Sequence, residues 1–164
     1  MAKKKNDSRK KPAPPTHADA ELVLKLYDLR REPELRRARQ FVMSELWPQS
    51  ADDYLAILSE FGTQRNAWYR QATSYWEMAA SLVVRGVVNR EIFVDWSSEM
   101  WMIYGKALPY LKEIRERSGM PGMYGHMERV IQSTPGFEQR LAGLQKRLSD
   151  LGKRAAKTAA GSRS

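Results

Sequence analysis

Few residues of this 164-residue chain have the type and spacing that enzyme or metal chemistry requires. There is no cysteine, which excludes disulfides, thiolate metal sites and cysteine nucleophiles. Of the two histidines, His17 lies near the N-terminal end and His126 lies close to Glu128, and no further histidine completes a metal site. A lone histidine is most often a surface or packing residue, although a general-base role for His126 stays open.

Two other patterns also fall short of a catalytic arrangement. Asp52 and Asp53 are adjacent, and adjacent residues on a helix do not face each other, so they fit the acidic first turn of a helix better than a carboxylate pair. Residues 119–125 contain three glycines but follow no strand and lack the Lys–Ser/Thr ending of a phosphate-binding loop. We therefore expect no catalytic residue, no metal ligand and no cofactor, and we predict that the protein is not an enzyme.

The hydropathy of the chain argues against a membrane span. Its longest uninterrupted apolar stretch, Met100–Tyr104, is far shorter than the roughly 20 residues that a membrane-spanning helix needs. The N-terminal lysines are followed by no apolar segment of the secretory type. These features predict a cytoplasmic protein.

The excess positive charge lies at the two ends. The formal net charge is +9, with +5 on residues 1–16, +5 on residues 146–164 and −1 on the residues between them. The N-terminal end is rich in Lys, Pro and Ala and has no large apolar residue, which predicts disorder. We predict a disordered basic tail over 1–18, a helical domain over 19–152 and a basic tail over 153–164, with disorder at its last residues, 158–164.

These basic ends have two interpretations. They can contact the phosphates of nucleic acid, or they can simply keep the protein in solution, which is the commoner role of such charge blocks. No aromatic residue is interleaved with the N-terminal bases to stack on nucleotides. The candidate polyanion contacts are Lys3, Lys4, Lys5, Arg9, Lys10, Lys11, Lys153, Arg154 and Lys157.

Between the two ends, apolar residues repeat at helical spacing and no strand-like alternation occurs. We predict an all-α, compact bundle of six or seven helices. Asp19, Ser50 with Asp53, and Asn89 are the expected N-caps, and Pro33 is expected at a first helical position. The predicted helices cover about 19–31, 33–47, 50–61, 63–85, 90–117, 126–131 and 135–152.

The segment over 90–117 has apolar residues three and four apart, but Pro109 falls inside it. A proline clashes with the carbonyl four residues earlier, here that of Gly105, so we expect one bent helix, with a break between 105 and 109 as the alternative. Such a seam is typical of packing within the molecule, although an intermolecular coiled coil remains the second interpretation.

Some apolar residues are candidates for a partner surface. Two of them lie off the main seam of the 90–117 segment, and the others form the stripe of the last helix. That basic amphipathic helix can pack on its own domain, dock on a partner or lie on an anionic membrane. The candidate partner residues are Trp101, Tyr104, Phe137, Leu141, Leu144 and Leu148.

The region 75–115 resembles a family of small all-helical bacterial proteins, a domain of unknown function. The resemblance rests on the triplet Tyr75-Trp76-Glu77 before an apolar helix end and Gly86, and on Pro109–Arg115 at the end of a long aromatic helix with Gly105 near its middle. It implies a helical fold in a bacterial cytoplasm and supplies no activity.

These observations favour a non-enzymatic protein-interaction module with an unidentified protein partner. The alternative is a nucleic-acid-associated accessory protein that acts through its basic tails. An unrecognised enzyme or small-molecule binder is a third hypothesis of lower weight.

Overall fold

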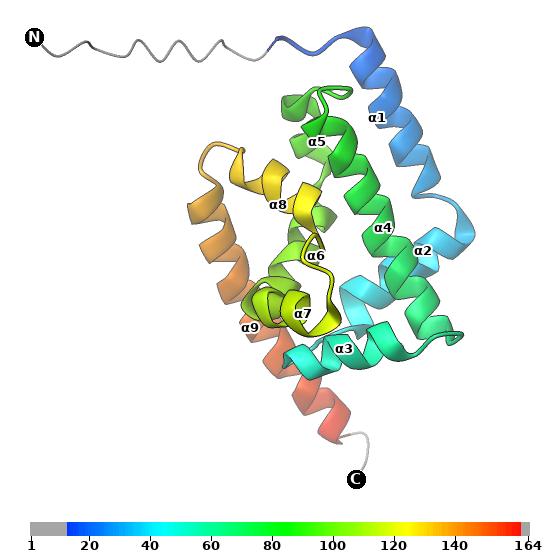
Figure 1. Cartoon of the computed structure of the whole chain (residues 1–164), viewed down its shortest axis with the longest axis vertical. Helices are drawn as coiled ribbons and strands as arrows, with labels where there is room; N and C mark the ends of the chain where they lie inside the picture. Colours follow the sequence, from blue (N-terminus) through cyan, green and yellow to red (C-terminus); the bar gives the residue numbers. More distant parts are fainter. Residues whose placement is uncertain (1–12, 162–164) are drawn as a thin grey trace, which may run out of the picture.

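The structure, a computed structural model, describes residues 13–161, and every regular element within this range is a helix (Figure 1). The predicted all-α class is confirmed, but six or seven helices are too few, because two predicted helices are divided. Within the same range, every helix is too short or too polar to span a lipid bilayer. The elements are α1 (His17–Leu29), α2 (Pro33–Gln40), the π-helix η1 (Phe41–Glu45), α3 (Ala51–Ser59), α4 (Gln64–Val84), α5 (Arg90–Trp96), α6 (Ser98–Ala107), the 3-10 turn η2 (Leu108–Tyr110), α7 (Leu111–Ser118), α8 (Gly125–Gln132) and α9 (Phe137–Gly161).

Local sequence signals determine where most helices start. At α3, the Ser50 hydroxyl accepts from the N–H of Asp53, and the Asp53 carboxylate accepts from the N–H of Ser50, which is the predicted reciprocal cap. Pro33 is the first residue of α2, also as predicted. At α1 the predicted cap is wrong, because Thr16 caps the helix and Asp19 is the third-position acid that completes the box.

The predicted single helix over 90–117 is wrong. α5 ends at Trp96 and α6 begins at Ser98, with neither proline nor glycine at this break. The expected interruption near Pro109 is present as η2, because Pro109 has no N–H to donate to the carbonyl of Gly105. The amide Nε2 of Gln145 on α9 donates to that carbonyl instead, at 2.6 Å.

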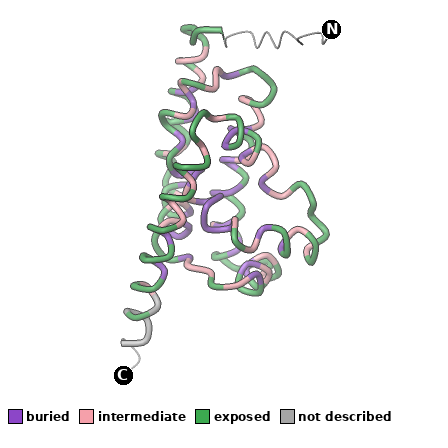
Figure 2. Tube along the Cα trace, turned by 90° about the vertical axis from the view of Figure 1, so that its left-hand side faces the viewer, coloured by how far each residue is buried: buried purple, intermediate pink, exposed green. Residues whose placement is uncertain are grey.

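α4 and α6 form the centre of the fold. α4 packs on α2, α3 and α8, whereas α6 packs on η1, α8 and α9. The buried stretches of the chain lie along the inside of this arrangement (Figure 2). Nearly all of α6 is buried, including Met100, Trp101, Ile103, Tyr104 and Ala107.

α9 runs along one edge of the fold, and its C-terminal turns reach past the other helices (Figures 1 and 2). It lies close to α6 because Gly105 has no side chain: a Cβ there would be 3.0 Å from carbons of Leu144 and Leu148. The predicted domain edges shift accordingly, because α1 begins at His17 and α9 continues through residues 153–161. α9 runs through 158–161, where disorder is predicted and stays a prediction, and the predictions for 1–12 and 162–164 lie outside the described residues.

Candidate functional site

The six residues predicted as a partner surface do not form an exposed patch. Trp101, Tyr104 and Leu148 are buried, and the other three are partly buried against the same core. The prediction is wrong because α9 turns its apolar stripe onto α6 and α8, and Arg140 of α9 lies 4.0 Å above the Trp101 ring. The partly buried residues are Phe137, Leu141 and Leu144.

Of the predicted polyanion contacts, those near the C-terminal end lie within the described residues. Lys153, Arg154 and Lys157 are exposed on α9. Exposed Lys146 and Arg147 precede them on the same helix. The remaining candidates lie outside the described residues: Lys3, Lys4, Lys5, Arg9, Lys10 and Lys11.

His126 is held by Glu77, which connects α4 to α8. A Glu77 oxygen lies 2.8 Å from Nδ1 of His126, and the carboxylate accepts hydrogen bonds from the backbone N–H groups of His126 and Met127. The first N–H groups of a helix have no acceptor within the helix. The Glu77 carboxylate supplies that acceptor at the start of α8. The other ring nitrogen faces Arg85 at 3.3 Å. Among residues 13–161, no three potential metal ligands come together.

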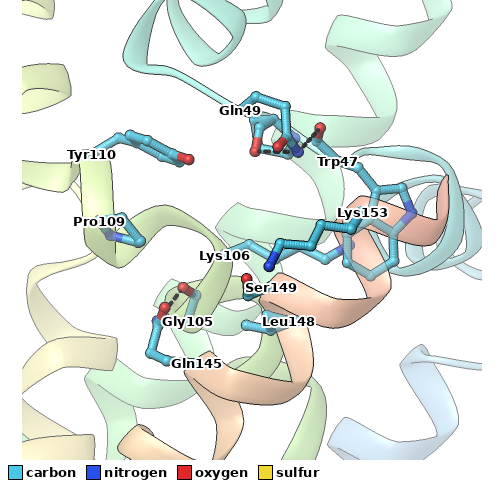
Figure 3. Close-up of a pocket in the computed structure, with 12 residues that line it drawn as sticks. Trp47, Gln49, Gly105, Lys106, Pro109, Tyr110, Gln145, Leu148, Ser149 and Lys153 are labelled. Atoms are coloured by element: carbon cyan, nitrogen blue, oxygen red, sulfur yellow. Dashed lines mark hydrogen bonds between the residues drawn. The ribbon is translucent and has the colours of Figure 1, made fainter. Parts of the chain in front are cut away.

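A cavity of about 330 Å³ lies between α9, the junction of α6 with η2, and the segment 47–49 that follows η1 (Figure 3). Its described lining contains Lys106 and Lys153 but no aspartate or glutamate. Pro48, Pro109 and Leu148 supply apolar surface to the same lining. The cavity is therefore small, partly apolar and positively charged.

Lys106 is buried in the wall of this cavity. Its ammonium donates to the carbonyls of Val42, Met43 and Leu46 at 2.8–3.0 Å and lies 3.7 Å from the centre of the Trp47 ring. These carbonyls lie at the C-terminal end of η1, where no backbone N–H of a following helical turn is available to donate to them. Burial lowers the pKa of Lys106 to about 7.

A second hollow, of about 500 Å³, lies beside α4 and is mostly apolar. Its rim carries Phe61, from the turn between α3 and α4, and Met120, from the loop before α8, which are 76% and 42% exposed. Tyr69 and Tyr124 line its base, with their hydroxyl groups hydrogen-bonded to each other. Burial raises the pKa of both phenols, so they stay neutral.

The loop over 119–124 forms one side of this hollow and is fixed by a network of hydrogen bonds from α7 and α6. Arg115 donates to the carbonyl of Met123 and, at 2.9 Å, to the carboxylate of Glu128. The hydroxyl of Tyr104 donates to the other oxygen of Glu128, also at 2.9 Å. Tyr104, predicted as a partner contact, thus supports the loop from inside the molecule.

Sequence reasoning missed both Lys106 and Phe61. Lys106 had a signal, since it is the only charged residue between Met100 and Leu111, in a segment that otherwise reads as buried. Phe61 had none, because it continues the apolar pattern of the helix before it and only the turn at Gly62, with φ of 84°, carries it outward.

The sequence model of one protein family, described as a domain of unknown function (DUF4760), matches residues 15–134. This range includes the whole region of resemblance over 75–115 and ends before α9 begins. No curated protein and no solved structure matches the chain. The hollow beside α4 therefore lies wholly within the family region, whereas the cationic cavity also uses α9.

Proposed function

We propose that this chain, which belongs to the DUF4760 family, is a non-enzymatic interaction module that binds an acidic, apolar segment of a partner protein along α4. The single observation behind the proposal is the pair of exposed apolar side chains, Phe61 and Met120, facing one mostly apolar hollow. Burying such a side chain against a partner is favourable by about 1.5–3 kcal/mol. Large apolar residues placed together at a surface are typical of binding sites.

The shape of this surface favours a peptide-like segment. A further hollow, of about 460 Å³, lies over the start of α4 and shares Arg70 and Ser74 with the first. The two hollows therefore adjoin along α4, and we call them together the α4 groove. A rim of Phe61 beside such a groove suits a segment that inserts one apolar side chain and continues along the helix.

The charge of the α4 groove favours an acidic partner. Its charged lining residues are Arg70 and Glu77. Glu77 already accepts hydrogen bonds from the start of α8, whereas Arg70 is exposed and forms no ion pair within residues 13–161. A carboxylate beside the inserted side chain would complement Arg70.

Selection of phage-displayed peptides on the full chain is expected to enrich sequences with an aromatic or long aliphatic residue next to Asp or Glu. Replacing Phe61 with alanine or Arg70 with glutamate should weaken the selected peptides by about tenfold or more, because each removes a central contact. Fluorescence anisotropy with labelled peptides measures the change.

Leu24→Ala is the matched control, since Leu24 is 64% exposed on α1 and does not line the α4 groove. Its affinity for the same peptides should stay within about twofold of the parent protein. Selected peptides without this pattern, or equal binding by the Phe61→Ala variant, would refute the proposal.

The non-enzymatic part of the proposal rests on how the polar groups are used. His126 and Glu77 come closest to an acid–base pair, yet the oxygens of Glu77 also accept from two backbone N–H groups of α8. A carboxylate with this structural task is poorly placed to exchange protons with a substrate.

A second candidate function is association with nucleic acid. The observation in its favour is the group of exposed bases Lys153, Arg154 and Lys157 on α9, a helix whose C-terminal turns reach past the other helices (Figure 2). A protruding basic helix can approach a phosphate backbone without a clash from the rest of the domain.

Deletion of residues 1–12 together with 153–164 tests this candidate while keeping Thr16, the cap of α1. Binding of a short DNA duplex by the parent chain should weaken steeply with salt, and the truncated chain should lose about tenfold in affinity and much of that salt dependence. Electrophoretic mobility at several salt concentrations measures both. Unchanged affinity after the deletion would exclude the tails as phosphate contacts.

A further inference from the structure

The cationic cavity beside α9 has hydrogen-bonding groups that the protein itself does not use. Within residues 13–161, no hydrogen bond or ion pair is formed by the Lys153 ammonium or by the hydroxyl groups of Tyr110 and Ser149. Lys153 extends into the cavity, and the Tyr110 hydroxyl points into it from the opposite wall (Figure 3). Three donors that have no partner among the described residues therefore line one cavity.

The same cavity lacks the negative charge that normally accompanies buried cations. Lys106 and Lys153 both line it, and no carboxylate does among the described residues. Lys106 uses its three N–H groups on backbone carbonyls, so it contributes positive potential and leaves direct contacts to Lys153. Of the two, Lys106 is buried, and a buried ammonium without a counter-charge is unfavourable, so an anion in the cavity would relieve it.

Two of the residues that line the cavity are glycines at contacts of α9 with other segments. Gly105 allows α9 to approach α6, and Gly152 lies where a Cβ would come within 3.4 Å of Nε2 of Gln49 and 3.8 Å of the Trp47 ring. The side of the cavity near Pro48, Pro109 and Leu148 is apolar. Its volume lies at the lower end of the range for small-molecule sites, which is about 300–1,000 Å³.

We propose that this cavity binds a small organic anion, whose carboxylate or phosphate accepts hydrogen bonds from the free donors and whose apolar part lies against the prolines and Leu148. This site goes beyond the α4 groove, with which it shares no lining residue. Its ligand is a small molecule rather than a protein segment, so either proposal can fail without the other.

Titration of the full-length chain with benzoate and with phenyl phosphate, followed by calorimetry and by the NMR signals of the tryptophan indoles, tests the site. At least one anion is expected to bind with Kd below about 1 mM. Lys153→Gln should weaken it about tenfold, because the variant removes the charge that contacts the anion. Whichever probe binds better assigns the head group as carboxylate or phosphate.

Lys157→Gln is the matched control. It removes the same charge as Lys153→Gln from an exposed position on α9, but Lys157 does not line the cavity. Its affinity for the anion should stay within about twofold of the parent chain. The proposal is overturned if neither probe binds at about 10 mM, if the two variants weaken binding equally, or if neutral benzyl alcohol binds as well as the anions.

Discussion

Replacing Glu99 with alanine is expected to lower the free energy of unfolding by about 3–5 kcal/mol, measured by urea denaturation. Glu99 lies at the start of α6, and its side chain is only 9% exposed. Its carboxylate pairs with Arg30 from the end of α1 and, at 2.8 Å, with Nε of Arg39 from α2. The variant leaves two mostly buried guanidinium groups without a counter-charge.

The surroundings of Arg30 make this loss hard to relieve. Its guanidinium lies 5.2 Å from the centre of the Trp76 ring, and its Nε is buried without a hydrogen-bond partner. Arg39 is fixed as well, since it also donates to the carbonyl of Arg30 at 3.2 Å. The Arg30 side chain is only 13% exposed and is held between α1 and α6, so the penalty for its unpaired charge appears as lost stability.

Two comparison variants separate the charge from the volume of the side chain. Glu99→Gln keeps the shape and should lose nearly as much stability as Glu99→Ala, because the arginines stay unpaired in both. Glu113→Ala removes an exposed partner of Arg117 and should change the free energy of unfolding by less than about 0.5 kcal/mol. A loss below about 1 kcal/mol for Glu99→Ala would show that the cluster is solvated.

The sequence predicts local features of this fold well. The cap at Ser50 and the first-position proline of α2 both occur as expected, because each depends on a few neighbouring residues. The apolar stripe of α9 is also correct as a stripe. The spacing of apolar residues does not show which element packs against that stripe. In the structure, α6 of the same chain does so.

The site residues were harder to predict because their roles arise between distant segments. Lys106 satisfies the end of η1, more than sixty residues earlier in the chain, and Lys153 belongs to a cavity only because α9 returns to the segment 47–49. Trp101 and Tyr104 were placed on a surface because their second face had no visible partner in the sequence. Arg140 and Glu128 are those partners in the folded molecule.

The stability of the chain relative to a Lys106→Met variant is expected to rise as the pH increases from about 7 to about 10. Burial lowers the pKa of Lys106 from 10.5 to about 7 in the folded chain. Between these values the unfolded chain holds a proton that the folded chain has lost. Stability rises with pH wherever the unfolded state binds more protons, and at 1.36 kcal/mol per pH unit the gain is at most about 5 kcal/mol.

The methionine variant removes this titration and keeps every other lysine, so the difference between the two urea-denaturation curves isolates Lys106. Below about pH 7 the group is protonated in both states, and the difference should be flat. The groups that contact the ammonium within the described residues are the carbonyls of Val42, Met43 and Leu46 and the Trp47 ring. Lys153 is the other charged residue that lines the same cavity.

The surroundings of the Lys106 ammonium change its pKa in opposite directions, so the pH dependence of stability shows which effect is larger. The three carbonyls and the ring favour the charged amine, whereas burial disfavours it. A relative stability that stays flat up to about pH 10 and falls only at higher pH would mean that the carbonyls prevail and that the folded chain holds its proton more tightly. An anion bound in the cavity should shift the balance the same way, so the rise with pH should shrink when benzoate or phenyl phosphate is present.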